Sequence, residues 1–361
     1  MAGRDVVCIG ASAGGVEMLI DVVRQLPADF PGAVFVVLHV PPDNPSVLAS
    51  LLDRRSALHA RYPTDRELIE RGVIYVAPPD HHLLVKRGHV RITRGPRESG
   101  FRPAVDPLFR TAAVAYRERT VGVVLSGNLD DGTVGLAAIK RYGGVAIAQD
   151  PVEAIYSGMP QSAIDRVGVD HIVRLKDLGP LLTRLAHEPV AVNGAPMTEE
   201  DEELEMEADI AEMDSEAITQ AVRPGTPSGY GCPDCGGALY ALRNGDIVHF
   251  RCRVGHAWST DALMNRTGET LDAALWTALR ALEENMSLSL SVAERMRARG
   301  NALGAKRFAA QAEVAHKNAE TIRAVLSQDR GAGSIARDPA RLHSDATAIV
   351  NGMEPNAGSN L

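Results

Sequence analysis

The chain has 361 residues, 45% of them hydrophobic and 23% charged, which is enough for one large core and something smaller. No apolar run approaches the roughly 20 residues of a membrane-spanning helix, and the N-terminus lacks the apolar region of a signal peptide. We therefore expect a cytoplasmic protein without membrane insertion.

The charge is unevenly distributed. The net charge is -8, but eleven acidic residues and no Lys or Arg lie between Glu199 and Glu216. The rest of the chain is close to neutral. With no basic stripe and few aromatic residues to stack on bases, the sequence argues against nucleic-acid binding.

Apolar runs alternate with helical patterns up to about Glu188. Strands are predicted at Val6-Ile9, Ala33-Leu38, Val73-Val76, Val121-Leu125, Val145-Ala148 and His171-Val173, a hairpin at Leu83-Lys86 and His89-Thr93, and helices from Gly15, from Ser46, at Asp106-Tyr116, from Gly132 to Arg141 and up to Leu185. This pattern predicts an α/β fold with three layers and a mostly parallel, doubly wound sheet. Ligands of such sheets bind at the carboxyl ends of the strands.

The first strand runs into Gly10-Ala11-Ser12-Ala13-Gly14-Gly15 and then into a helix. Glycines around Ser12 permit a sharp turn, and the amides of a new helix favour developing negative charge, so Ser12 is a candidate nucleophile. Two other roles remain open at this point. Ser12 is also suited to cap the helix, and the glycine turn to hold a phosphate.

A histidine follows the second strand. Ala33-Leu38 is wholly apolar and ends at His39, which places an imidazole at the same sheet edge as Ser12. A dinucleotide-binding domain would have an acidic residue there for the ribose hydroxyls. His39 is therefore the candidate general base, although a hydrogen-bonded structural histidine is the alternative.

Two adjacent acids follow the strand that ends at Leu125. Either Asp130 or Asp131 is suited to orient the histidine, and both are also ordinary residues for a loop before a helix.

Several ordered segments resemble the catalytic domain of the chemotaxis protein-glutamate methylesterase (CheB) family over about residues 4 to 188. They are Ile9-Gly10-Ala11-Ser12-Ala13-Gly14-Gly15, Leu38-His39-Val40-Pro41, Tyr75-Val76-Ala77-Pro78 with His82-Leu83, Arg102-Pro103-Ala104-Val105-Asp106-Pro107-Leu108-Phe109, Gly122-Val123-Val124-Leu125-Ser126-Gly127 through Asp131-Gly132, and Ala148-Gln149-Asp150 with Gly158-Met159-Pro160.

The resemblance implies a Ser12 nucleophile, a His39 base and Asp131 as the orienting acid, with the backbone N-H of Asn128 as an oxyanion donor. It implies an esterase that removes methyl groups from glutamate side chains of chemoreceptor-type signalling proteins, and deamidation of glutamine at the same sites. The chain departs from the family at Ala13, commonly Thr, and at Leu129, commonly Gly. The family usually has a receiver domain ahead of the esterase, and because the first strand here begins by Asp5 we expect none in this chain.

The acidic segment lies within a stretch rich in Pro and Gly. We expect residues 1-190 to form the catalytic domain and residues 191-227 an acidic flexible linker. A weak helical face of Met206, Ile210, Met213 and Ile218 is the alternative for this stretch.

Three of the four cysteines cluster with a histidine in residues 228-260. Cys232 and Cys235 form one pair, and Cys252 and His256 follow after a predicted hairpin at Ala238-Leu242 and Ile247-Arg251. This Cys₃His spacing predicts a structural zinc ribbon with no open position for catalysis. A disulfide or redox pair at Cys232 and Cys235 is the alternative, which a reducing cytoplasm disfavours.

Helical periodicity returns after the ribbon. Leu271, Leu275, Leu279, Leu282 and Met286 predict one helix, and Phe308, Val314, Ile322 and Leu326 a second, so residues 261-328 should form a helical hairpin that binds a protein partner or self-associates. Residues 329-361 lack periodicity and predict a disordered tail.

Two functions follow. The first is a serine methylesterase that needs no cofactor for catalysis. The second is a weakly active or inactive regulatory scaffold that acts through partner binding by its C-terminal module.

Overall fold

The computed structural model describes residues 3-43, 47-190, 198-213 and 225-332. Its contacts divide the chain into one compact unit that ends at Leu263 and a second that begins at Met264.

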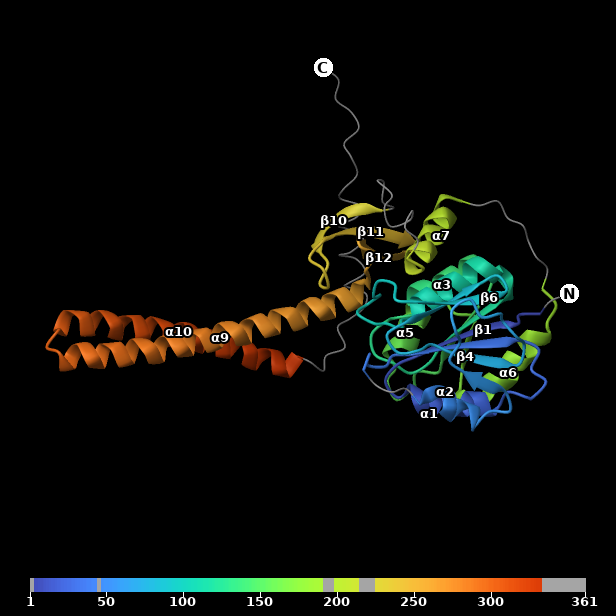
Figure 1. Ribbon diagram of the computed structural model, residues 1–361, viewed down its shortest axis with the longest axis horizontal. Coiled ribbons are helices and arrows are strands. Elements are labelled where there is room, and N and C mark those ends of the chain that lie inside the picture. The colour runs from blue at the N-terminus through green and yellow to red at the C-terminus, as the bar shows by residue number, and fades with distance from the viewer. Residues whose placement is uncertain (1–2, 44–46, 191–197, 214–224, 333–361) are drawn as a thin grey trace, which may run out of the picture. The chain divides into compact units, whose positions relative to one another are not determined.

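A seven-stranded sheet forms the centre of the first unit (Figure 1). Its strands are all parallel, in the order β3 (His59–Arg61), β4 (Val73–Val76), β2 (Ala33–Leu38), β1 (Val6–Ala11), β7 (Thr120–Val124), β8 (Val145–Gln149) and β9 (His171–Val173). The chain extends from β1 to one side first and then crosses to β7 on the other. The strand order therefore reverses between β1 and β7, the position at which such sheets bind ligands.

Helices cover both faces of this sheet, as predicted for a doubly wound fold. On one face lie α1 (Gly15–Arg24), α2 (Leu48–Asp53) and α6 (Leu175–His187), and on the other α3 (Val105–Tyr116), α4 (Thr133–Arg141) and α5 (Gly158–Val167). Strand β1 serves both cores, because Val7 and Ile9 face the first set of helices while Val6 and Cys8 face the second. Cys8 is completely buried and packs as a small apolar residue.

The hairpin of β5 (His82–Lys86) and β6 (His89–Thr93) is also present and packs on α3. Strand β3 and helix α5 were not predicted. β3 has only three residues, and α5 begins Gly-Met-Pro with little apolar periodicity, so neither gives a clear signal.

The acidic segment contains a helix, α7 (Glu199–Ala211), so the predicted flexible linker is wrong for these residues. Thr198 and Asp201 form a capping box at its start, where acidic side chains are electrostatically favourable. Leu204 and Ala208 are buried, and the helix packs on α3. Residues 191-197 and 214-224 of the predicted linker lie outside the described residues.

A second, antiparallel sheet contains the cysteines. Its order is β10 (Thr226–Gly231), β11 (Ala238–Asn244), β12 (Ile247–Cys252) and β13 (Ala257–Ser259), around Leu239, Phe250 and Trp258. The predicted hairpin corresponds to β11 and β12, whereas β10 and β13 were not predicted. This sheet belongs to the same compact unit as the seven-stranded sheet, so the regions predicted as domains 1-190 and 228-260 pack against each other.

The second unit is a helical hairpin, as predicted, formed by α10 (Ala302–Ala332) and by the part of α9 (Thr260–Ala298) that follows Leu263. Gly300, with φ 75°, lies in the connection, and Leu279, Ala319 and Leu326 form a small core between the helices. Residues up to Ala332 continue α10 where the sequence predicted a tail, and the rest of that tail lies outside the described residues. Among the described helices, none is both long and apolar enough to cross a membrane.

Candidate active site

Three neighbouring parallel strands bring the predicted catalytic residues together. Ser12 follows β1, His39 follows β2, and Asp131 lies in the loop after β7. The Nδ1 atom of His39 lies 3.0 Å from Ser12 Oγ, and its Nε2 atom lies 2.6 Å from Asp131 Oδ2. These distances link a hydroxyl, an imidazole and a carboxylate in one hydrogen-bonded chain.

The arrangement decides which nitrogen of His39 carries the proton. An ionised Asp131 accepts a hydrogen bond from Nε2-H, which leaves the Nδ1 lone pair directed at the Ser12 hydroxyl. This is the tautomer that a general base needs. Ser12 is not a helix cap, because the N-cap of α1 is Gly14 at φ 72°.

Asp131 is held by the start of α3. Its two carboxylate oxygens accept the backbone amides of Val105 at 2.7 Å and Asp106 at 3.1 Å. α3 comes this close because Gly10 has no side chain: a Cβ there would lie 2.3 Å from Val105 Cγ1. Burial raises the pKa of Asp131, but the hydrogen bond and charge of His39, with the two amides, outweigh burial and lower it overall.

Phe101 stacks on the catalytic imidazole. The ring centroids of Phe101 and His39 are 3.7 Å apart with an interplanar angle of 8°. Sequence reasoning missed this residue. The only available signal was its position directly before the Arg102-Pro103 segment that resembles the esterase family.

Gly127 gives the nucleophile its space. A Cβ on Gly127 would lie 2.1 Å from Met159 Sδ and 2.8 Å from Ser12 Cβ. The adjacent Ser126 hydroxyl donates to the Ala13 carbonyl at 2.8 Å and accepts the Tyr156 amide at 2.9 Å. The serine turn and the loop after β7 are thus fixed to each other.

The backbone amides near Ser12 differ in their availability. The Ser12 amide donates to Ser126 O and the Gly127 amide to Tyr156 O, each at 2.9 Å. Among the described residues, the amides of Ala13 and Asn128 have no backbone carbonyl partner. Asn128 is exposed, and the following Leu129 adopts φ 61°, where the esterase family commonly has glycine.

The second acid of the pair, Asp130, faces away from His39. It accepts the Ser259 hydroxyl at 2.5 Å and Arg166 Nη1 at 3.1 Å. Burial and the charge of Asp261 raise the pKa of Asp130 to about 7, despite the opposing effects of Ser259 and Arg166. The structure thus distinguishes the two candidates, since only Asp131 contacts the imidazole.

The first unit also contains a buried ion cluster. Glu98 accepts Arg110 Nη2 at 2.6 Å and Arg251 Nη2 at 3.0 Å. Glu207 of α7 accepts the same Arg251 nitrogen at 2.7 Å and His249 Nε2 at 2.8 Å. Since these side chains come from the catalytic fold, α7 and β12, the cluster joins all three.

The Cys₃His residues also come together. Ligand atoms of Cys232, Cys235, Cys252 and His256 all lie within 4.8 Å of one another. His256 Nδ1 is 3.8 Å from Cys232 Sγ and 3.7 Å from Cys252 Sγ, and the Cys235 and Cys252 sulfurs are 3.7 Å apart. Tetrahedral zinc with Zn-S bonds of about 2.3 Å requires ligand separations of about 3.8 Å, so this set fits the ion.

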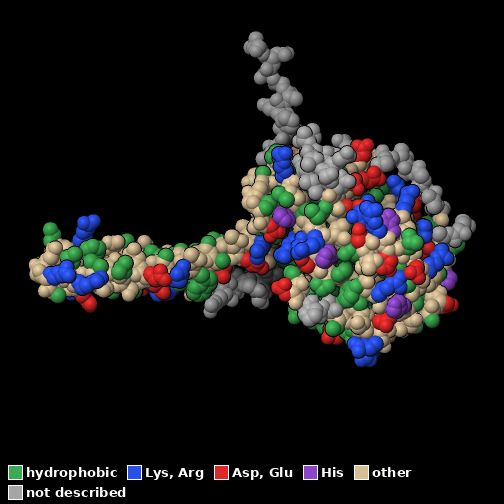
Figure 2. Space-filling model, viewed as in Figure 1, with side chains coloured by type: hydrophobic (Ala, Val, Ile, Leu, Met, Phe, Trp, Pro, Cys, Tyr) green, Lys and Arg blue, Asp and Glu red, His purple; other side chains and the backbone are tan. Residues whose placement is uncertain are grey.

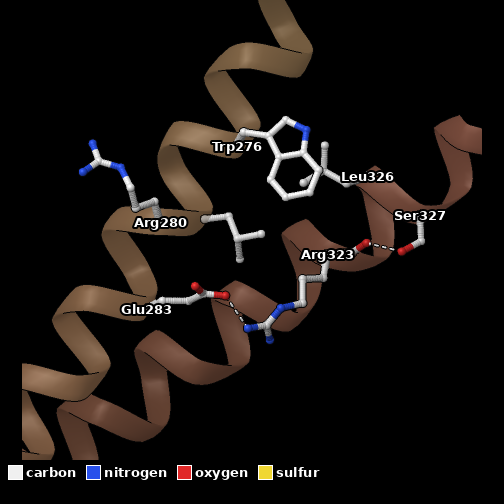
Figure 3. A pocket seen from close by; sticks show the side chains of 7 residues that line it. Trp276, Arg280, Glu283, Arg323, Leu326 and Ser327 are labelled. Atoms are coloured by element: carbon white, nitrogen blue, oxygen red, sulfur yellow. Dashed lines mark hydrogen bonds and ion pairs between the residues drawn. The ribbon is translucent and has the colours of Figure 1, made fainter.

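Other surface features give weaker indications. On the face drawn in Figure 2, Lys and Arg side chains are interspersed with Asp and Glu, as the balanced charge predicts. In the helical hairpin, a groove of about 460 Å³ is lined by Trp276, Leu279, Arg280, Glu283, Arg323, Leu326 and Ser327 (Figure 3). Arg323 and Glu283 form an ion pair across it.

Known proteins resemble the catalytic unit. The CheB methylesterase family model matches residues 7-182. A relative from Leptospira interrogans, named "Putative protein-glutamate methylesterase/protein-glutamine glutaminase", is 34% identical over 182 residues, which are 50% of this chain and 94% of that protein. A relative from Pyrococcus horikoshii, named "Protein-glutamate methylesterase/protein-glutamine glutaminase", is 36% identical over 48% of this chain and 49% of its own length.

A solved structure, the CheB methylesterase catalytic domain of Thermotoga maritima, is 34% identical and covers 51% of this chain and 100% of that chain, with a TM-score of 0.49. The match with the Leptospira relative extends over nearly all of that protein. The chain therefore belongs to the CheB methylesterase family.

Proposed function

We propose that this protein is a serine esterase that removes methyl esters from glutamate side chains of chemoreceptor-type signalling proteins. The observation that carries the proposal is the hydrogen-bonded chain from Ser12 through His39 to Asp131, with distances of 3.0 and 2.6 Å. Family membership and the printed names of the relatives supply the substrate class.

The mechanism follows from the geometry. His39 Nδ1 takes the Ser12 proton while Ser12 Oγ attacks the ester carbonyl carbon, which gives a tetrahedral oxyanion. Collapse of this intermediate breaks the bond to the methoxy oxygen, and His39 returns the proton so that methanol leaves. Water then attacks the acyl-serine with His39 again as base, which frees the glutamate side chain and restores Ser12.

The oxyanion needs donors that are not already used. We assign this role to the backbone amide of Asn128, together with that of Ala13, the residue after the nucleophile. Both amides are without a backbone carbonyl partner among the described residues. The same steps with ammonia as the leaving group would deamidate glutamine, consistent with the second half of the relatives' names.

We further propose a structural zinc ion held by Cys232, Cys235, Cys252 and His256. The support is the separation of their ligand atoms, which suits a tetrahedral ion. Four protein ligands fill the coordination sphere, so the ion would stabilise the small sheet rather than take part in ester hydrolysis. Cysteine ligands of this kind suit a reducing compartment, which favours the cytoplasm.

The test is methanol release from a methylated chemoreceptor, together with labelling of the protein by a serine-reactive fluorophosphonate. Ser12→Ala should abolish both signals, whereas Ser50→Ala, at an exposed position on α2, should change neither. Undiminished methanol release by Ser12→Ala would contradict the nucleophile assignment.

The alternative is a scaffold with little turnover. It is favoured by Leu129, whose φ of 61° lies in the loop that carries the Asn128 amide. Failure of the wild-type protein to label at Ser12, or to release methanol, would support this scaffold and reject the esterase.

A further inference from the structure

We infer that the four-stranded sheet β10–β13 is a positioning element for the catalytic triad, so that turnover at Ser12 depends on the Cys₃His site. The inference rests on the proposed function and concerns its regulation. It is carried by contacts of β13 on two segments, one that bears Phe101 and one that bears Asp131.

The first contact is between backbones. The Ser99 amide donates to the Ala257 carbonyl at 2.7 Å, and the Ala257 amide donates to the Arg97 carbonyl at 3.2 Å. A parallel bridge joins Glu98 to Ala257. Strand β13 therefore extends its own sheet onto a loop of the catalytic fold.

That loop is a tight turn that presents Phe101. Ser99 at φ 51° and Gly100 at φ 82° occupy its two central positions, and the Glu98 and Phe101 backbones pair with each other across it. A serine at positive φ is unfavourable on its own, so the external hydrogen bonds of Ser99 help to hold the turn. The orientation of the Phe101 ring, and hence its stack on His39, depends on this turn.

The second contact is between side chains. Ser259, the last residue of β13, donates its hydroxyl to Asp130 at 2.5 Å and accepts the Ala262 amide at 3.1 Å. Arg166 bridges Asp130 at 3.1 Å and Asp261 at 2.7 Å. Asp130 directly precedes Asp131, so these bonds restrain the backbone that aims the catalytic carboxylate.

The Cys₃His site controls the position of β13. His256 directly precedes Ala257, and its carbonyl accepts the Cys252 amide at 2.9 Å. An ion bound by Cys252 and His256 would fix the turn between β12 and β13 and therefore the register of Ala257 and Ser259. Without the ion, the turn between β12 and β13 would no longer be held by Cys252 and His256. The buried ion pairs of Arg251 would still hold β12.

The test compares the zinc-loaded full chain with a Cys235→Ser variant and with wild-type protein treated with a chelator. Cys235 is chosen because it is the most exposed of the four residues. Amide hydrogen exchange of the segment from Arg97 to Phe101 should be faster in both metal-depleted forms, and kcat about tenfold or more lower, with KM changed less. Zinc added back to the chelated wild type should restore both values.

Two serine variants separate positioning from stability of the sheet. Ser259→Ala removes the bond to Asp130 and should lower kcat and the rate of Ser12 labelling while zinc content stays unchanged. Ser228→Ala is the matched control, because this buried hydroxyl donates to Leu239 O within the same sheet. It should leave kcat unchanged.

The outcomes distinguish this inference from the proposed function. If the zinc-loaded protein does not label at Ser12, the esterase assignment fails, and the hydrogen exchange still reports whether the sheet restrains the turn. The positioning role is rejected if the metal-depleted and Ser259→Ala proteins label and turn over at the rate of the zinc-loaded wild type, and if exchange at Arg97 to Phe101 is the same in all of them.

Discussion

The Oδ2 atom of Asp131 accepts the Val105 amide at 2.7 Å, and the same oxygen lies 2.6 Å from His39 Nε2. One atom therefore joins the first turn of α3 to the catalytic imidazole. A helix N-terminus stabilises negative charge, so α3 keeps the carboxylate ionised at the place where the mechanism generates an imidazolium.

Replacing this carboxylate tests its role. Asp131→Asn should lower kcat by about 10⁴-fold, because an amide does not enforce the tautomer that leaves Nδ1 free for Ser12. Methanol release measures the effect. Asp165→Asn, an exposed change on α5, is the control and should behave as wild type. Equal activity of the two variants would exclude Asp131 as the orienting acid.

A methyl group added at Gly127 should displace Ser12 and lower turnover. Gly127→Ala would place a Cβ 2.1 Å from Met159 Sδ and 2.8 Å from Ser12 Cβ, so the serine turn or the loop has to move. A displacement of about 1 Å is enough to lower turnover by about 100-fold. Gly268→Ala is the control, because an added Cβ at this helical position meets no atom within 4 Å, and it should behave as wild type. Fluorophosphonate labelling that stays fast in Gly127→Ala would contradict the expected crowding.

Removing one charge from the buried ion cluster should destabilise the protein, because its buried partners are then left unpaired. Glu207→Gln removes the charge that pairs with Arg251 and His249, and we expect a loss of about 3 kcal/mol in the free energy of unfolding. Urea denaturation measures it. Glu202→Gln, an exposed substitution in the same helix, should change this free energy little. Indistinguishable midpoints would show that the cluster is not a strong contact between α7 and the sheets.

The raised pKa of Asp130 predicts that the stability of the protein depends on pH. Its pKa is raised to about 7 in the folded protein, against about 4 in an unfolded chain. The folded state thus retains a proton that the unfolded state releases, so this group's contribution is fully present below about pH 4 and is lost as the pH rises through about 7. Asp130→Asn should remove that decline. Denaturation curves across this window check it, and the same slope in wild type and variant would refute it.

Much of the catalytic fold could be predicted from the sequence, because buried parallel strands are continuous apolar runs. Ala33-Leu38 is the clearest case: its end fixed the place of His39 beside the Ser12 turn. Ser12 and His39 follow neighbouring parallel strands, so both lie at the carboxyl end of the sheet. The structure was needed only for the distances between them. The choice between Asp130 and Asp131 came from the family resemblance, since both acids follow the same strand.

The contacts made across long sequence separations could not be predicted. Phe101 lies on a turn whose partner is β13, and no local pattern links these segments. Helix α7 was not predicted, because a segment with so many acidic residues is typical of a solvated spacer. Its Glu207 is buried only because Arg110 and Arg251 from other parts of the chain neutralise it.

The pairing of β13 with the catalytic fold also has a consequence for the newly made protein. Ser259 follows Asp130 by 129 positions, and its amide bonds to a side chain 160 positions earlier. At a synthesis rate of about 5–20 residues per second, the ribosome needs on the order of ten seconds to reach Ser259 after Asp130. During this interval the nascent domain has its triad residues but not the strand that supports them, so the enzyme would mature only late in translation.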